Sequence, residues 1–354
     1  MTLQAGLIGT GRVGQNHAEA YDATDGVELQ AIAEIDADRR AESGDRHGIP
    51  EHRRYREYEA MVDEEQLDIV SVATPAGAHY DHVCTLVRSQ PDISVVWCEK
   101  PIATSVRRAE TMVSMCDDAD IELVVNHLRR FSYAHEELRE LLSEGVLGTV
   151  ESVRVTTDGE FLNIGTHYVD LLLYLLDATI ADVRAGHIET VRSSNEVRYA
   201  GGGTFALDTG TAVYIDPVEA APHRLSIHGT RATVSVPLNI APDAGTSWDY
   251  WRIEDGSRTR TEVPNSLQER WETDISGVPS GYEPGDVPAQ SLFENAAGHI
   301  VDLAAGNRDN AAPGSRAAHG LAGLTGLVAS ATTGSRISLP IAGPLRGISL
   351  AHET

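Results

Sequence analysis

The chain opens with Leu3-Gln4-Ala5-Gly6-Leu7-Ile8-Gly9-Thr10-Gly11-Arg12-Val13-Gly14, an apolar run followed by three glycines in the pattern G-x-G-x-x-G. This pattern is typical of a buried strand that turns directly into a helix: the first glycine permits the tight turn, and the third lets the helix pack against the sheet. The second glycine lets the backbone approach a phosphate group, which the N–H groups of the helix N-terminus would bind. We therefore predict a phosphate-binding turn made of Gly9, Thr10, Gly11, Arg12, Val13 and Gly14.

The same alternation continues to about residue 125. Short apolar runs predict strands at 3–8, 29–33, 69–73, 95–98 and 123–125, and amphipathic stretches predict helices at 13–21, 37–47, 78–89 and 105–117. Strands that alternate with helices indicate parallel βαβ units and a doubly wound sheet. We predict an α/β fold whose first domain, residues 1–125, binds a dinucleotide.

The residue that would choose the dinucleotide follows the second predicted strand. Glu34 comes after Ala31-Ile32-Ala33, about 20 residues beyond the glycine turn. A carboxylate here accepts hydrogen bonds from the ribose hydroxyls of NAD and repels the extra phosphate of NADP. Ile35 follows, where an Arg would hold that phosphate, so we predict that NAD is preferred over NADP. The alternative is a glycine-rich turn without a ligand and a surface Glu34.

The pattern changes after residue 125. Helices are predicted at 132–144, 166–176, 289–305 and 315–332, and a half-exposed strand at 149–157. Successive β-type runs at 186–191, 211–215, 224–228 and 233–236 lack helices between them and indicate an antiparallel sheet. Segment 241–288 is polar and rich in Pro and Gly, and it is expected to be a long surface excursion. We predict a second domain over residues 126–354.

The composition argues against several classes of partner. The formal charge of −25 disfavours nucleic acid and anionic membranes. Because the acids are dispersed, we hypothesise a salt-adapted host, in which the repulsion is screened. No run reaches the roughly 20 apolar residues of a membrane span, and no secretory signal is recognisable. Cys84, Cys98 and Cys116 lack metal-type spacing and are interpreted as buried side chains, so we expect a cytoplasmic protein without a metal site.

One basic residue stands apart from the others. Of the 28 Lys and Arg residues only Lys100 is a lysine, and it lies in Cys98-Glu99-Lys100-Pro101. Arg is locked in its charged form, whereas the pKa of a Lys ammonium can be tuned by its surroundings. Lys100 is therefore a candidate for chemistry, although a single lysine can also arise by chance.

Further motifs follow in a characteristic order: Thr74-Pro75-Ala76-Gly77-Ala78-His79, the Glu99-Lys100-Pro101 element, Arg129-Arg130-Phe131, Gly145-Val146-Leu147-Gly148 and Asn163-Ile164-Gly165-Thr166-His167-Tyr168-Val169-Asp170. From about residue 3 to 340 the chain resembles the glucose–fructose oxidoreductase, inositol dehydrogenase and MocA family. The resemblance implies a Rossmann domain, an α/β domain with a large and mostly antiparallel sheet, and homo-oligomers, dimers or tetramers, formed through the sheet face. It also implies a sugar, cyclitol or related polyol as substrate.

The resemblance also implies roles for single residues. Lys100 and His167 would act at the reacting carbon, and the cofactor would contact Glu34, Ile35, Thr74, Pro75, His79, Glu99 and Lys100 in addition to the glycine turn. Two departures from the family matter. Asn163 stands where many members have Asp, so a carboxylate-assisted mechanism is in doubt, and Ala76 replaces the usual Asn.

The chemistry assigns these residues distinct tasks. A His with an ordinary pKa near 6.5 suits the removal of a hydroxyl proton, which we assign to His167. An ammonium stabilises developing negative charge on the substrate oxygen, which we assign to Lys100. Asn163, Arg130 and Asp170 are expected to bind substrate.

Structural alternatives remain for the histidines. His167 can instead be a structural residue at a helix start. His79 and His82 share a helix face, but no third ligand accompanies them, so a metal pair is disfavoured.

Three functions fit this pattern. The first is a sugar or cyclitol dehydrogenase. The second is an NAD-dependent lyase or glycosidase that uses a transient oxidation. The third is a non-catalytic dinucleotide-binding regulator, which the presence of both Lys100 and His167 disfavours.

Overall fold

The structure is a computed structural model that describes residues 2–90, 92–157, 159–192, 196–218, 223–238, 248–274 and 290–353. The chain divides into two compact units. The first comprises Met1–Ala103, Arg107–Phe131 and Gln290–Ala318; the second comprises Thr104–Val106, Ser132–Ala289 and His319–Thr354. This division differs from the expected boundary at residues 125 and 126, because a late segment of the chain belongs to the first unit.

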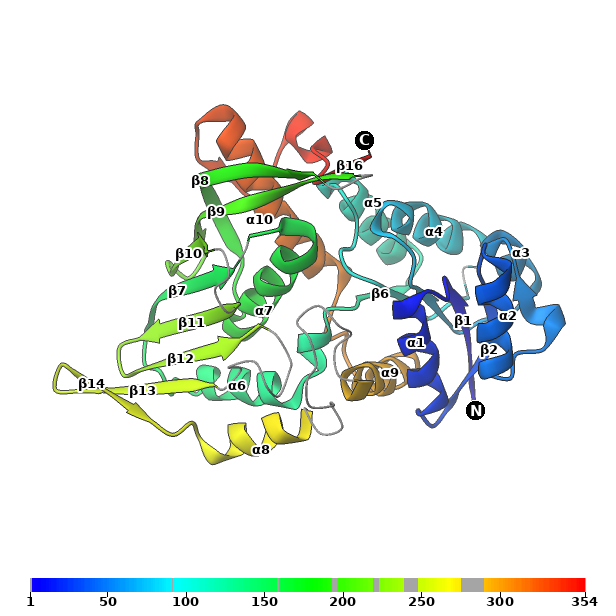
Figure 1. Ribbon diagram of the computed structural model, residues 1–354, viewed down its shortest axis with the longest axis horizontal. Helices are drawn as coiled ribbons and strands as arrows, with labels where there is room; N and C mark the ends of the chain where they lie inside the picture. Colours follow the sequence, from blue (N-terminus) through cyan, green and yellow to red (C-terminus); the bar gives the residue numbers. More distant parts are fainter. Residues whose placement is uncertain are drawn as a thin grey trace. The chain divides into compact units, whose positions relative to one another are not determined.

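The first unit is built on a sheet of six parallel strands in the order β3-β2-β1-β4-β5-β6 (Figure 1). The strands are β1 (Leu3–Ile8), β2 (Val27–Ala33), β3 (Arg54–Tyr55), β4 (Ile69–Val72), β5 (Val95–Cys98) and β6 (Glu122–Val125). The predicted doubly wound parallel sheet is confirmed. The sequence pattern missed β3, because two residues show no periodicity.

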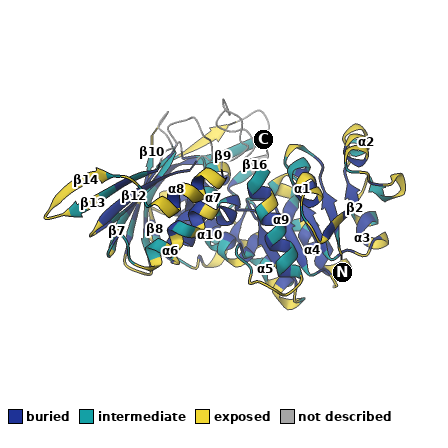
Figure 2. Cartoon of the chain, turned by 90° about the horizontal axis from the view of Figure 1, so that it is seen from below, coloured by how far each residue is buried: buried dark blue, intermediate teal, exposed yellow. Residues whose placement is uncertain are grey.

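Helices follow the strands of this sheet, except for the last of the set, which comes late in the chain. They are α1 (Arg12–Asp22), α2 (Ala37–Arg46), α3 (Tyr58–Glu64), α4 (Ala76–Ser89), α5 (Val106–Asp118) and α9 (Gln290–Ala304), with short 3-10 turns η1 (Glu51–Arg53) and η2 (Leu128–Phe131). Every residue of β4 and β5 is buried, as expected for central strands of a parallel sheet. Exposed residues gather on the outer helices, as on α2 (Figure 2).

Helix α9 completes the core of the first unit although it comes late in the chain. It lies beside α1 (Figure 1), and the Gln290 side chain donates a hydrogen bond to the Asn16 carbonyl at 3.3 Å. The buried ring of Phe293 contacts the rings of His17 and Trp97, with centroids 5.4 Å and 6.4 Å away. Residues 290 onward therefore contribute directly to the packing around the first βα unit.

The second unit contains a ten-stranded sheet in the order β14-β13-β12-β11-β7-β10-β9-β8-β15, with β16 paired to β9. Among the described strands of this second sheet, only β7 and β10 pair in parallel, so the predicted, mostly antiparallel sheet is confirmed. The strands are β7 (Val150–Thr157), β8 (Ile180–Arg192), β9 (Glu196–Leu207), β10 (Ala212–Pro217), β11 (Arg224–Gly229), β12 (Ala232–Pro237), β13 (Asp249–Glu254), β14 (Ser257–Thr261), β15 (Ile337–Ser338) and β16 (Ala351–Glu353).

One face of this sheet is apolar and the other is polar. Along β7 the side chains of Val153 and Val155 are buried, whereas Arg154 between them is exposed and pairs with Asp216 at 2.7 Å. The remaining elements are α6 (Tyr133–Ser143), α7 (Thr166–Leu176), α8 (Asn265–Asp274), α10 (Gly314–Thr333), the π-helix η3 (Phe161–Gly165) and the 3-10 turn η4 (Gly343–Gly347). Helix α10 approaches the sheet closely, since a Cβ at Gly323 would lie 2.5 Å from Ile180.

The expected surface excursion at 241–288 is wrong for residues 249–274, which form the β13–β14 hairpin and helix α8. Asp255 and Gly256 both have positive φ and close the hairpin in a two-residue turn. Trp248 and Trp271 are buried with ring centroids 5.6 Å apart. Residues 241–247 and 275–288 of that prediction lie outside the described residues.

Two further observations concern the whole described chain. No helix within its described ranges has both the length and the apolar character needed to cross a membrane. Cys84, Cys98 and Cys116 are buried, free thiols, and burial raises the pKa of each.

Candidate functional site

In the glycine turn between β1 and α1, two of the three glycines have no room for a side chain, whereas the third faces open space. A Cβ at Gly9, whose φ is +89°, would lie 2.8 Å from the Ala73 carbonyl oxygen, and one at Gly14 would lie 2.1 Å from the Gly9 carbonyl oxygen. A Cβ at Gly11 would meet no atom within 4 Å. The backbone is therefore tightly packed at the turn itself, and accessible at the position expected to face a phosphate.

The N-terminus of α1 is compatible with an anion. Gly11 is its N-cap, and no side chain accepts a hydrogen bond from the first turn. Arg12 is exposed and Val13 is half-buried. Backbone N–H groups at such a terminus, together with the positive end of the helix dipole, suit a pyrophosphate.

Glu34, at the end of β2, is tied to this turn. Its carboxylate accepts hydrogen bonds from the Thr10 backbone N–H (2.9 Å), the Thr10 hydroxyl (3.3 Å) and the Asp36 backbone N–H (3.0 Å). The side chain is 7% exposed, whereas Ile35 is 71% exposed. The Arg39 guanidinium lies 3.9 Å from the Glu34 carboxylate. The sequence-based prediction considered only position 35 as the place for such a cation and therefore missed Arg39.

The loops after β4 and β5 are joined through His79. Its ring nitrogens lie 2.7 Å from the Thr74 carbonyl oxygen and 2.9 Å from the Pro101 carbonyl oxygen. Burial lowers the pKa of His79, against the opposing effect of these two carbonyls. The side chain is 0% exposed, so a cofactor cannot contact it without rearrangement. Pro75 is the exposed N-cap of α4.

Glu99 and half-buried Lys100 follow β5 directly. Glu99 is 8% exposed, and one of its oxygens accepts hydrogen bonds from His17 (3.0 Å) and Asn126 (2.5 Å). The other oxygen accepts from the Lys100 backbone N–H at 3.2 Å. Burial raises the pKa of Glu99, but the hydrogen bond and charge of His17, the Asn126 donor and the Lys100 charge outweigh it, so the net pKa is lowered.

These groups gather at one edge of the sheet. Gly9, Glu34, Thr74 and Glu99 each follow the carboxyl end of a parallel strand, and ligands of open α/β sheets bind outside such ends. Arg130 also belongs to the first unit, in η2. It is 8% exposed and donates a hydrogen bond to the Ala311 carbonyl at 2.9 Å, which gives it a structural contact.

The second unit carries the other candidates on two consecutive helical segments. Asn163 is exposed on the π-helix η3, where its backbone N–H donates to Glu160 at 2.6 Å. Helix α7 begins at Thr166, as predicted, so His167 lies in its first turn and is half-buried. Asp170 is 4% exposed and lies three residues further, on the same helix face.

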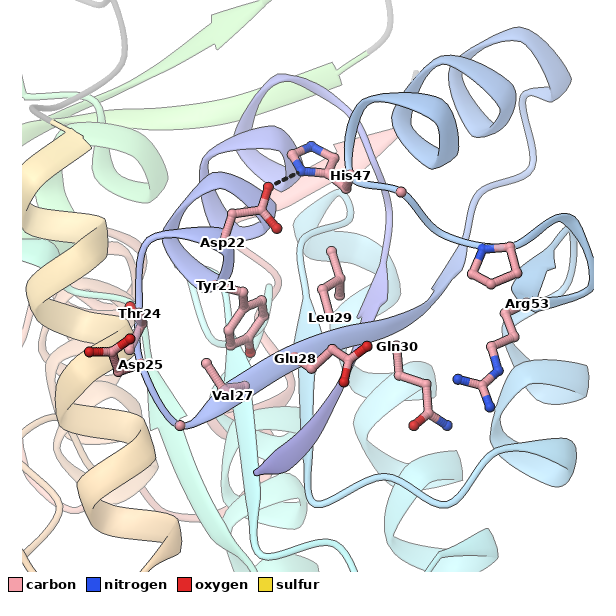
Figure 3. A pocket seen from close by; sticks show the side chains of 13 residues that line it. Tyr21, Asp22, Thr24, Asp25, Val27, Glu28, Leu29, Gln30, His47 and Arg53 are labelled. Carbon is pink, nitrogen blue, oxygen red and sulfur yellow. Dashed lines mark hydrogen bonds and ion pairs between the residues drawn. The ribbon is translucent and has the colours of Figure 1, made fainter. Parts of the chain in front are cut away.

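Two pockets in the described chain lie away from these residues. One, of about 470 Å³, is lined by Tyr21, Asp22, Thr24, Asp25, Gly26, Val27, Glu28, Leu29, Gln30, His47, Gly48, Pro50 and Arg53. Figure 3 shows His47 paired with Asp22, at 2.6 Å, above the start of β2. This pocket is at the amino end of β2, whereas the glycine turn follows the carboxyl end of β1. The second, of about 510 Å³, includes Leu175 and Leu176 at the far end of α7 from His167.

The structure adds three residues to the sequence-based set: His17, Asn126 and Arg39. His17 lies three residues after the third glycine of the turn, and its side chain faces the interior. The amphipathic pattern of the helix predicts this orientation, but it does not predict which residue His17 contacts. Asn126 directly follows β6. Within the residues that the structure describes, no three His, Cys, Asp or Glu side chains are grouped to hold a metal ion.

Comparison with known proteins adds a consistent set of relatives. Residues 3–127 match the model of an oxidoreductase family with an NAD-binding Rossmann fold. The chain is 28% identical to a D-apiose dehydrogenase of Paraburkholderia graminis, over 80% of this chain and 82% of that protein. It is 26% identical to D-xylose 1-dehydrogenase (NADP(+)) 2 of Haloferax volcanii, over 81% and 91%.

A solved structure shares the fold. An oxidoreductase of Agrobacterium radiobacter, in complex with NAD+, L-tartaric acid and magnesium, superposes with a TM-score of 0.74 at 19% identity, covering 96% of this chain and 98% of that one. The glycine turn and the parallel sheet agree with these relatives: residues 3–127 match the NAD-binding Rossmann fold of the glucose–fructose oxidoreductase, inositol dehydrogenase and MocA family, and about 80% of the chain is similar to sugar dehydrogenases.

Proposed function

We propose that the chain is an NAD-dependent dehydrogenase that transfers a hydride between the cofactor and a secondary alcohol of a sugar, cyclitol or related polyol. The observation that carries the proposal is the glycine turn, closed at Gly9 and Gly14 but open above Gly11. This shape fits a pyrophosphate better than a purely structural turn, which has no need of a glycine at the open position. The sugar dehydrogenases among the relatives support the substrate class.

The cofactor residues follow from this turn. The turn would hold the pyrophosphate, and Glu34 would accept hydrogen bonds from the adenosine ribose in exchange for those of Thr10. We propose a preference for NAD because this carboxylate repels a ribose phosphate. Arg39 opposes that preference, and one relative uses NADP by name, so the preference must be measured. Thr74, Pro75 and Glu99 would support the nicotinamide end, with His79 bracing two loops from the interior.

The chemistry divides between two groups. The glycine turn and Glu34 would hold the dinucleotide, whose nicotinamide would supply the hydride acceptor. Lys100 would stabilise negative charge on the substrate oxygen, and His167 would take the hydroxyl proton. Asn163 is proposed to orient the substrate, and buried Asp170, one turn from His167, is proposed to orient the imidazole. For Arg130 the bond to Ala311 favours a supporting role over a substrate contact.

Three measurements test the proposal. Calorimetry with NAD and NADP at several salt concentrations tests the cofactor site, and heat from neither would refute it. A panel that includes D-apiose, D-xylose and myo-inositol, scored by NADH absorbance, tests the reaction. Lys100→Met is expected to lower turnover by orders of magnitude while NAD still binds, and a variant with unchanged turnover would remove Lys100 from the mechanism.

The same panel separates the alternatives. Substrate loss without accumulated NADH would favour a lyase or glycosidase that uses a transient oxidation. NAD binding without turnover of any panel member would favour a regulatory protein. Cytoplasmic localisation and assembly as a homo-oligomer, dimer or tetramer, remain proposals. Light scattering after size exclusion tests the assembly.

A further inference from the structure

Glu99 is a buried carboxylate placed one residue before the only lysine of the chain. It is 8% exposed and receives donors from three directions: His17 on α1, Asn126 after β6, and the backbone N–H of Lys100. A buried charge is tolerated only when such donors satisfy it. The three contacts fix the chain at the residue that carries the ammonium group.

The hydrogen bonds behind Glu99 form a continuous chain into the core of the first unit. The Tyr21 hydroxyl lies 2.8 Å from the Ser71 hydroxyl, which lies 3.1 Å from Nδ1 of His17. Burial raises the pKa of Tyr21, so its hydroxyl stays protonated. Nε2 on the other side of the His17 ring lies 3.0 Å from the Glu99 carboxylate, which can only accept a hydrogen bond when it is ionised. Every member has a matched partner, and the carboxylate at the end of the chain is the acceptor.

The surroundings of Glu99 favour its ionised form. The titratable groups that interact with it are His17 on α1, His79 on α4, and Cys98 and Lys100 on its own segment. Of these, Lys100 is the only one with a strongly basic side chain. The attraction between the two charges is mutual, so an anionic Glu99 stabilises the ammonium form of Lys100.

We propose that Glu99 is a positioning residue for Lys100: its buried carboxylate anchors the Lys100 backbone through the N–H contact and keeps the side chain in the ammonium form. The catalytic consequence rests on the proposed function, but the effect on the ammonium does not. A purely structural Glu99 would stabilise the fold without altering the protonation of Lys100.

The solitary lysine makes the direct test simple. In protein labelled with 13C-lysine, the one lysine Cε signal belongs to Lys100, and its chemical shift reports protonation without any substrate. We expect Glu99→Gln to lower the midpoint of this titration by roughly one pH unit, because an adjacent opposite charge shifts a pKa by about one to three units. Glu65→Gln is the matched control: Glu65 is also buried in the first unit and hydrogen-bonded, to Tyr55 at 2.8 Å, and it should leave the midpoint unchanged.

Further variants keep the test decisive. Glu99→Asp retains the charge and should titrate like the wild type, which also covers the case that Glu99→Gln fails to fold. A Glu99→Gln midpoint equal to the wild type, or a Glu99→Asp midpoint lowered as far as that of Gln, overturns the proposal.

Kinetics extend the test to the reaction. With the fastest sugar or cyclitol of the panel, Glu99→Gln should lower kcat about 10- to 100-fold, by analogy with the loss seen when an outer-shell partner that orients a metal ligand is removed. In a Lys100→Met background, followed by single turnover with excess enzyme, the same change should cost less than about twofold, because its target is gone. An equal loss in both backgrounds overturns the coupling. Absence of NADH from wild-type enzyme with the whole panel instead contradicts the proposed function and leaves the NMR test intact.

Discussion

Replacing Gly11 by Ala separates a ligand-binding turn from a merely structural one. Gly11 has φ −64° and ψ −172°, which Ala adopts readily, and an added Cβ meets no atom within 4 Å. The free energy of unfolding should therefore stay constant or rise by about 0.4–1 kcal/mol, since Ala restricts the unfolded chain. The methyl group would, however, occupy space that a pyrophosphate needs. Overpacking of this size costs about 1–3 kcal/mol, so NAD should bind roughly 10- to 100-fold more weakly.

Calorimetric titration of NAD and chemical unfolding of the same preparations measure both effects. Gly14→Ala is the contrasting variant: its Cβ would lie 2.1 Å from the Gly9 carbonyl oxygen, so both stability and affinity should fall. Gly298→Ala, within α9 and with no atom in reach, controls for the substitution itself and should leave NAD affinity unchanged. Wild-type NAD affinity in Gly11→Ala would refute the idea that this glycine faces the cofactor.

Other predictions address the cofactor, the fold and the surface. Glu34→Ser should raise the affinity for NADP relative to NAD at least about tenfold, because the repelling carboxylate is gone while Arg39 remains; competition titrations measure the ratio. Asp274→Ala should lower the free energy of unfolding by about 2–4 kcal/mol, since its buried carboxylate accepts three hydrogen bonds at the start of α6; urea unfolding tests this. Burial lowers the pKa of His299 to about 4, and its neutral Nε2 accepts a hydrogen bond from the Ala311 N–H. The contribution of His299 to the free energy of unfolding is therefore complete above the ordinary pKa of 6.5 and is lost as the pH falls toward 4. Between pH 6.5 and 4, the free energy of unfolding of the wild type should fall by up to about 3 kcal/mol more than that of His299→Gln, as measured by urea unfolding. With a net charge of −25, the unfolding temperature should rise from low to molar KCl, and equal values would contradict the salt-adapted surface.

The sequence predicted the first unit well because its parallel strands are buried on both faces. Strands β1 and β5 begin and end where the apolar runs do, and α7 also has its predicted bounds. The β13–β14 hairpin was missed because segment 241–288 was judged on its polar composition. Its Asp255-Gly256 turn, however, is a recognised sequence signal for a hairpin.

Only those residues of the candidate site that lie in short, continuous sequence motifs could be predicted from the sequence. The glycine turn, Glu34 and Lys100 each follow a strand that the pattern identifies. The partners of Glu99 could not be found this way, since His17 and Asn126 lie 82 and 27 residues away along the chain and meet it only through the packing of neighbouring strands. Similarly, the contact of Arg130 with Ala311 spans 181 residues, so its burial was invisible in the sequence.

The return of α9 to the first unit has a consequence for biosynthesis. When the ribosome has made residues 1–131, all six strands of the parallel sheet exist, yet the Phe293 ring that contacts Trp97 and His17 has not been translated. More than 150 further residues must therefore be synthesised before Phe293 can cover the rings of Trp97 and His17. We therefore expect the first unit to complete its folding only after α9 has been made, and a fragment that stops at residue 131 to aggregate rather than bind NAD.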